Sequence, residues 1–166
     1  TVNYYNNIGV ADGLPVIEFI SSFWQNILIV GPSQSRHGAS AIRFIDLDGD
    51  QDLDLAWGDY FQRSLYIIWN IGTNLTPDMD QENFVYQFPI NDPIYTSGQN
   101  MPSFADLDGD NVSDILVTNG GDNQASPFDP RPAGNLMVIS GATGSKLAMA
   151  LSPDSAEIYC SPVILD

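Results

Sequence analysis

An all-β fold, built from repeated four-stranded antiparallel sheets, is predicted for this chain of 166 residues. Short segments rich in Ile, Val, Leu and aromatic residues alternate with segments rich in Gly, Asn, Asp and Pro, a pattern typical of strands and turns. No long segment has the periodicity of an amphipathic helix. An acidic phrase, FIDLDGDQDLDLAWG from Phe44, returns as FADLDGDNVSDILVTNG from Phe104.

The two acidic phrases define a period of 60 residues, the separation between Asp46 and Asp106. The same step leads to Asp166, at the end of SPVILD, and this phrase resembles the MPSFAD that ends at Asp106. Near the other end, NNIG from Asn6 resembles WNIG from Trp69. We therefore expect the chain to begin within one repeat, to contain two complete repeats and to stop as a further one begins.

Four strands are predicted in each complete repeat. In the first repeat they are SAIRFI (40–45), LDLAWGDY (53–60), SLYIIWNI (64–71) and ENFVYQF (82–88). In the second they are MPSFA (101–105), DILVT (114–118), NLMVIS (135–140) and KLAMAL (146–151). Four short strands in each repeat are typical of a β-propeller blade. A β-sandwich with two similar hairpins is the alternative, but it does not require the repeat to continue at both ends.

This interpretation divides the chain into blades. We expect the end of a preceding blade at 1–39, complete blades at 40–99 and 100–159, and the start of a further blade at 160–166. Because the sheet faces of a blade are covered by its neighbours, the remaining blades of the propeller are the first expected partners.

Composition limits the possible functions. Hydrophobic residues make up 43% of the chain and charged residues 16%, which favours a packed core over disorder. The formal net charge of −16 disfavours nucleic acid and anionic membranes as partners, because both need a basic surface. No apolar run approaches the roughly 18 residues that span a bilayer. Cys160 is the single cysteine, so the chain has no internal disulfide and no cysteine-based metal site.

The acidic phrases are predicted to be metal-binding loops at 46–54 and 106–114. In the first loop, carboxylates occupy positions 1, 3, 5, 7 and 9: Asp46, Asp48, Asp50, Asp52 and Asp54. In the second they occupy positions 1, 3, 5 and 9, and a backbone carbonyl can serve at position 7: Asp106, Asp108, Asp110, Val112 and Asp114. A glycine at position 4 lets each loop bend. Several carboxylates and no nitrogen or sulfur suit Ca²⁺, so we predict one Ca²⁺ in each loop.

Two alternative interpretations of the loops are less consistent with the sequence. An EF-hand requires Gly at position 6 and Glu at position 12. Here position 6 is Gln51 or Asn111, and position 12 is Trp57 or Val117. A solvated acidic turn does not account for the return of the same four carboxylate positions after 60 residues.

The loops resemble the FG-GAP, or VCBS-type, calcium-binding propeller repeat of integrin α-subunits and many secreted bacterial proteins. The signature of that repeat is approximately D-x-D-G-D-G-x-x-D, followed by a strand and Gly. DLDGDQDLDLAWG and DLDGDNVSDILVTNG match it except at Gln51 and Asn111, where Gly is usual. NLMVISGATGSKLAMAL also resembles a hairpin of related secreted propellers. The resemblance implies an extracellular β-propeller with a calcium loop between strands 1 and 2 of each blade.

A ligand is expected on the face opposite the metal loops. In an up-and-down blade, the connection between strands 2 and 3 and the linkers between blades lie on that face. They gather a few basic and aromatic residues of an acidic protein, and these are the candidate ligand contacts: Arg36, His37, Tyr95, Phe128 and Arg131. The long loop Gly120–Asn135 belongs to the same face.

We expect a binding or adhesion module of a secreted or cell-surface protein, with an extracellular protein or glycan as its ligand. An enzyme is not expected, because His37 is the single histidine and no second catalytic group marks it. The fold alone does not decide function. The alternatives are the propeller domain of a secreted enzyme, of the polysaccharide lyase or quinoprotein type, and a structural component of an extracellular assembly.

Overall fold

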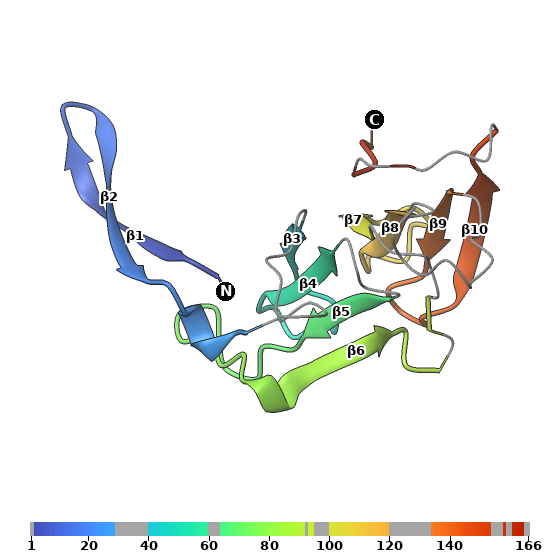
Figure 1. Ribbon diagram of the computed structural model, residues 1–166, viewed down its shortest axis with the longest axis horizontal. Helices are drawn as coiled ribbons and strands as arrows, with labels where there is room; N and C mark the ends of the chain where they lie inside the picture. The colour runs from blue at the N-terminus through green and yellow to red at the C-terminus, as the bar shows by residue number, and fades with distance from the viewer. Residues whose placement is uncertain are drawn as a thin grey trace, which may run out of the picture.

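The computed structural model describes residues 2–28, 40–59, 64–91, 93–94, 100–119, 134–153, 158 and 161–164. In these ranges the chain forms ten β-strands and two short 3-10 helices. The strands make three antiparallel sheets, one of two strands and two of four (Figure 1). The predicted all-β class, with four-stranded antiparallel sheets, is therefore confirmed. None of the helices in the described ranges is long and apolar enough to span a membrane.

The first sheet is a hairpin of β1 (Tyr4–Ala11) and β2 (Leu14–Ser21). Its two-residue turn is Asp12–Gly13, with φ of 52° and 79°, the pair of positive angles that a type I′ turn requires. Most residues of both strands are exposed, and Figure 1 shows the hairpin projecting away from the other sheets. A short 3-10 helix, η1 (Trp24–Asn26), follows it.

The two four-stranded sheets are meanders, in which each strand pairs with the next along the chain. The second sheet contains β3 (Ser40–Ile45), β4 (Asp54–Asp59), β5 (Leu65–Ile68) and β6 (Phe84–Phe88). The third contains β7 (Met101–Ala105), β8 (Asp114–Asn119), β9 (Asn135–Ile139) and β10 (Lys146–Leu151). Every strand overlaps the segment that the sequence predicts for it.

Two predicted strands extend two or three residues beyond one end of the observed ones. The segment 64–71 ends as β5 at Ile68, because the next backbone N–H groups bond outside the ladder with β4. That of Asn70 donates to the carboxylate of Asp54, and that of Ile71 donates to the carbonyl of Asp78. The segment 82–88 begins as β6 only at Phe84, because a second 3-10 helix, η3 (Gln81–Asn83), precedes it.

The second sheet has a core on each of its faces. In β5, Leu65 and Ile67 belong to a cluster that includes Ile115 and Val117 of β8 in the third sheet. Ile68 belongs to another cluster, together with Ile27 from the segment after the hairpin. Because successive strand residues point to opposite faces, this strand connects the two cores. The two four-stranded sheets therefore pack on one another through a shared apolar layer.

A close backbone approach brings the two sheets together near β3, β4 and β7, which contact one another. Gly58 lies in β4, and a Cβ atom at this position would overlap the backbone carbonyl of Asn100. Asn100 precedes β7, is fully buried, and donates from its side chain to the carbonyl of Ser64 at 3.2 Å. Gly58 therefore allows a contact between sheets that any other residue would hinder.

The shared core is expected to dominate stability. Leu65 is 0% exposed, whereas Leu75 is 94% exposed. Leu65→Ala should lower the free energy of unfolding by about 2–5 kcal/mol, because it removes apolar contacts and leaves a cavity. Leu75→Ala deletes the same atoms from the surface and should change it by less than about 0.5 kcal/mol. Urea unfolding of both variants measures the difference, and equal effects would contradict this core assignment.

Candidate metal centres

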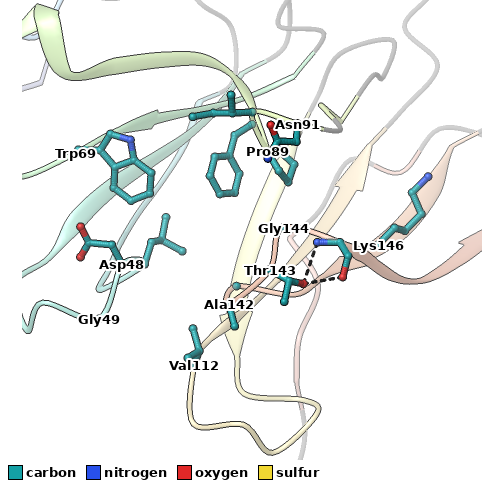
Figure 2. A pocket seen from close by; sticks show the side chains of 15 residues that line it. Asp48, Gly49, Trp69, Pro89, Asn91, Val112, Ala142, Thr143, Gly144 and Lys146 are labelled. Carbon is teal, nitrogen blue, oxygen red and sulfur yellow. Dashed lines mark hydrogen bonds between the residues drawn. The ribbon is translucent and has the colours of Figure 1, made fainter.

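Each acidic loop joins the first two strands of a four-stranded sheet. Residues 46–53 connect β3 to β4, and residues 106–113 connect β7 to β8. The two loops border one hollow of about 750 Å³ between the sheets. Figure 2 shows Asp48 and Gly49 of the first loop on one side of it, and Val112 of the second loop with the turn at Thr143 on the other.

The carboxylate at position 1 accepts two hydrogen bonds from the backbone of its own loop. Asp46 accepts the backbone N–H of Gly49 on Oδ1 at 2.7 Å and that of Gln51 on Oδ2 at 3.0 Å. The second loop repeats both hydrogen bonds at the same distances, with Asp106, Gly109 and Asn111. Each position-1 side chain therefore fixes the backbone at positions 4 and 6.

The carboxylates at positions 3 and 5 continue the same frame. Asp48 accepts the N–H of Asp50 at 3.2 Å, and Asp50 accepts the N–H of Asp52 at 3.0 Å. The second loop repeats these bonds at 3.2 and 2.8 Å, with Asp108, Asp110 and Val112. The replacement of Asp by Val at position 7 leaves this frame unchanged, because that position contributes its backbone N–H.

The carboxylate at position 9 joins each loop to the end of the third strand of its sheet. Asp54 is buried and accepts the N–H of Leu47 on Oδ2 at 3.0 Å and that of Asn70 on Oδ1 at 2.9 Å. Asp114 is also buried and repeats both bonds at 2.8 and 3.2 Å, with Leu107 and Gly141. The aspartate at position 9 therefore holds the start of the loop to the segment after the third strand in both sheets.

The backbone has the same shape in both loops at positions 4 and 6. Gly49 and Gly109 have φ of 81° and 82°, and no atom lies near an added Cβ at either, so conformation and not space selects glycine there. Gln51 and Asn111 have φ of 73° and 69°. The two residues that depart from the usual Gly at position 6 therefore adopt the left-handed conformation that a glycine would supply.

The carboxylate oxygens converge on a different set in each loop. In the first loop, one oxygen from each of Asp46, Asp48 and Asp50 lies within 4.8 Å of the others. In the second loop, the equivalent set is Asp106, Asp108 and Asp114. Of the predicted ligands in the described residues, Asp52, Asp54, Asp110 and Val112 lie outside these two sets. The presence of a cation remains a prediction.

Asp52 has a buried carboxylate oxygen whose negative charge no hydrogen bond compensates. Its side chain is buried, and its Oδ1 has no hydrogen-bond partner. Burial raises the pKa of this carboxyl, and the negative charges of Asp50 and Asp48 raise it further, although the side chain of Asn70 bonds to it. A buried, unpaired oxygen beside like charges is what a cation would stabilise.

The pKa of Asp54 is raised more strongly than that of Asp52. Burial raises the pKa of its carboxyl to about 6, and this outweighs the two backbone N–H groups, of Asn70 and Leu47, that favour the ionised form. In a metal-free loop, this side chain therefore holds a proton over part of the acidic range in which an ordinary aspartate has lost it.

Two asparagines support the first loop without being among the predicted site residues. The Oδ1 atom of Asn70 accepts the N–H groups of Gly72 and Asp78 at 3.1 and 2.9 Å, which shapes the connection after β5. The side chain of Asn74, from the same connection, donates to the carbonyl of Gln51. The repeated phrase NNIG and WNIG was the one sequence signal near Asn70, and no sequence signal indicated that Asn74 contacts the loop.

The residues of the predicted ligand face, Arg36, His37, Tyr95, Phe128 and Arg131, lie outside the described residues. The same applies to 120–133, most of the long loop that was assigned to that face. The assignment of a ligand to this face therefore stays a prediction.

Comparison with protein families gives one match, to an FG-GAP-like repeat over residues 46–117. The matched segment runs from the first acidic loop to β8 and includes the second loop. It confirms the resemblance stated from the sequence, as regards the repeat. Neither the curated proteins nor the solved structures gave a significant match to the chain.

The pKa of Asp54 predicts how metal-free protein responds to pH. This carboxyl loses its proton near pH 3.8 in the unfolded chain and near pH 6 in the folded chain. The folded state therefore binds more protons between these values, and its stability should fall as pH rises through that window. Melting temperatures in EDTA measure this. Asp54→Asn should flatten the fall, and Asp12→Asn, in the exposed hairpin turn, should not. An unchanged slope in Asp54→Asn would contradict the shift.

Proposed function

We propose that this chain, in which residues 46–117 form an FG-GAP-like repeat, is a segment of an extracellular β-propeller that binds Ca²⁺ and serves as a binding or adhesion module. The observation that supports it best is the equivalence of the two acidic loops. Six hydrogen bonds of the first loop have counterparts in the second, and two left-handed backbone positions coincide. An acidic turn without a function would not be expected to keep the same hydrogen bonds in both repeats.

Calcium is the cation that fits the donor set. Both convergent sets consist of carboxylate oxygens alone, and the chain's single histidine and single cysteine, His37 and Cys160, lie outside the described residues. Hard oxygen ligands in a flexible loop suit Ca²⁺ better than Zn²⁺, and several carboxylates suit it better than Mg²⁺, which retains its waters. A bound cation would also compensate the unpaired buried oxygen of Asp52.

The remaining blades of a propeller are the proposed first partners. Apolar side chains are exposed on both outer elements of the described chain. On the hairpin they include Ile8, Val10, Leu14 and Ile17, and on β10 they are Leu147, Met149 and Leu151. Large exposed apolar patches are rare on soluble monomers and mark contact surfaces. The inner faces of the two four-stranded sheets already pack on each other, as neighbouring blades do.

An extracellular location follows from the proposed chemistry. Loops on an exposed turn that lack a bidentate Glu suit the affinity of extracellular modules, roughly 10⁻⁴–10⁻³ M. We propose binding and not catalysis, because the titratable clusters in the described residues are the two sets of carboxylates, and the proposal assigns them to the cation. The proposed ligand is an extracellular protein or glycan on the face opposite the loops.

Calcium binding is tested by titrating the intact, chelator-washed chain in a calorimeter. Two sites should appear, because each loop has its own frame, and excess Ca²⁺ should raise the melting temperature above that in EDTA. A titration without binding heat, together with a melting temperature that EDTA leaves unchanged, would refute the proposal.

Matched substitutions separate the two sites. Asp48→Asn keeps the oxygen that accepts the N–H of Asp50 but removes one negative charge, so it should weaken the first site by about tenfold or more and spare the second. Asp108→Asn should do the reverse. The same change at exposed Asp12 should affect neither. Equal weakening of both sites by each loop variant would contradict independent loops.

A further inference from the structure

A second hollow, of about 440 Å³, lies between the N-terminal segment and the second sheet. Its volume is within the range of small-ligand pockets. Four aromatic residues line it: Tyr4 and Tyr5 of β1, Trp24 of η1 and Phe44 of β3. They come from three segments of the chain, so the folded structure alone brings them together.

Trp24 is the centre of this aromatic group. Its backbone N–H donates to the carbonyl of Val2 at 3.0 Å, which holds η1 against the first residues of the chain. Its ring meets that of Phe44 edge to face, with centroids 5.7 Å apart, and lies 6.1 Å from the ring of Tyr4. Phe44 and Tyr4 remain 45% and 37% exposed, so parts of both rings are open to a ligand.

Two of the three asparagines that line this pocket are committed to the protein. Asn70 and Asn74 line it, but the Oδ1 atom of Asn70 accepts two backbone N–H groups, and the amide of Asn74 donates to the carbonyl of Gln51. No charged side chain is among the lining residues in the described ranges. An anion would therefore find no basic group, and a neutral sugar would gain nothing from the negative charge of the protein.

The charge of the protein selects among the ligands that remain. The chain has a formal net charge of −16. A negative potential attracts cations, and aromatic faces bind cations that need no hydrogen bonds. We propose that this pocket binds a quaternary ammonium group. The proposal rests on the pocket and on charge, and not on Ca²⁺ binding or on propeller closure.

Choline and its neutral isostere, 3,3-dimethyl-1-butanol, test the proposal on the intact chain. The two ligands have the same shape, so an apolar pocket would bind them equally, whereas an aromatic site for cations should prefer choline by about tenfold. Titration calorimetry at low ionic strength gives both affinities. Equal affinities, or no binding of choline, would overturn the proposal. The preference should persist in EDTA and in Ca²⁺, so failure here is distinct from failure of the calcium sites.

Substitutions of the aromatic residues test where choline binds. Phe44→Leu keeps an apolar side chain but removes a ring, and it should reduce the preference for choline several-fold; Trp24→Leu should abolish it. Tyr86→Leu is the control, because Tyr86 is a comparably exposed ring of β6, 51% against 45%, that does not line the pocket. Melting temperatures check the fold of each variant, and Phe44→Leu decides the outcome if Trp24→Leu unfolds. A choline preference unchanged in Phe44→Leu, or lost equally in Tyr86→Leu, would refute this location.

Discussion

The buried aspartate at position 9 of each acidic loop is the constraint on which the two four-stranded sheets depend. Its carboxylate accepts one backbone N–H from the start of the loop and another from the second residue after β5 or β9. One side chain thus sets the bend between the first two strands and the end of the third. A buried carboxylate is costly unless such bonds compensate it. The raised pKa of Asp54 shows that the compensation is incomplete.

The hydrogen bonds of the position-9 aspartates bring several carboxylates together beside the hollow between the two sheets. Positions 1, 3 and 5 use their carboxylates to hold the loop backbone, and one oxygen from each of Asp46, Asp48 and Asp50 lies within 4.8 Å of the others. The first loop adds Asp52, whose buried oxygen lacks a partner, whereas the second has Val112. The two loops are therefore alike in shape and different in charge. A cation would contribute more to the first loop than to the second.

The two faces of the second sheet have different surroundings. One face shares a closed core with the third sheet, and the carbonyl of Asn100 leaves room only for a glycine at position 58. The other face is covered by the segment after the hairpin, through Ile27, and next to this segment lies the aromatic pocket. The face that shares its core with the third sheet fixes the position of the acidic loops. The face next to the aromatic pocket leaves aromatic surface accessible to a ligand.

The sequence by itself determined the strands of the two four-stranded sheets, the period and the loops. Short apolar segments bounded by turn residues predict strands, and the return of aspartates at fixed spacing predicts a loop because its carboxylates bond to nearby backbone. These are local relations. Only the tertiary structure decided that β5 ends where Asn70 turns toward Asp54, that Gly58 meets Asn100, and that Tyr4, Trp24 and Phe44 surround one hollow. These contacts join residues far apart in the chain, and no local pattern of residues records which distant segments packing brings together.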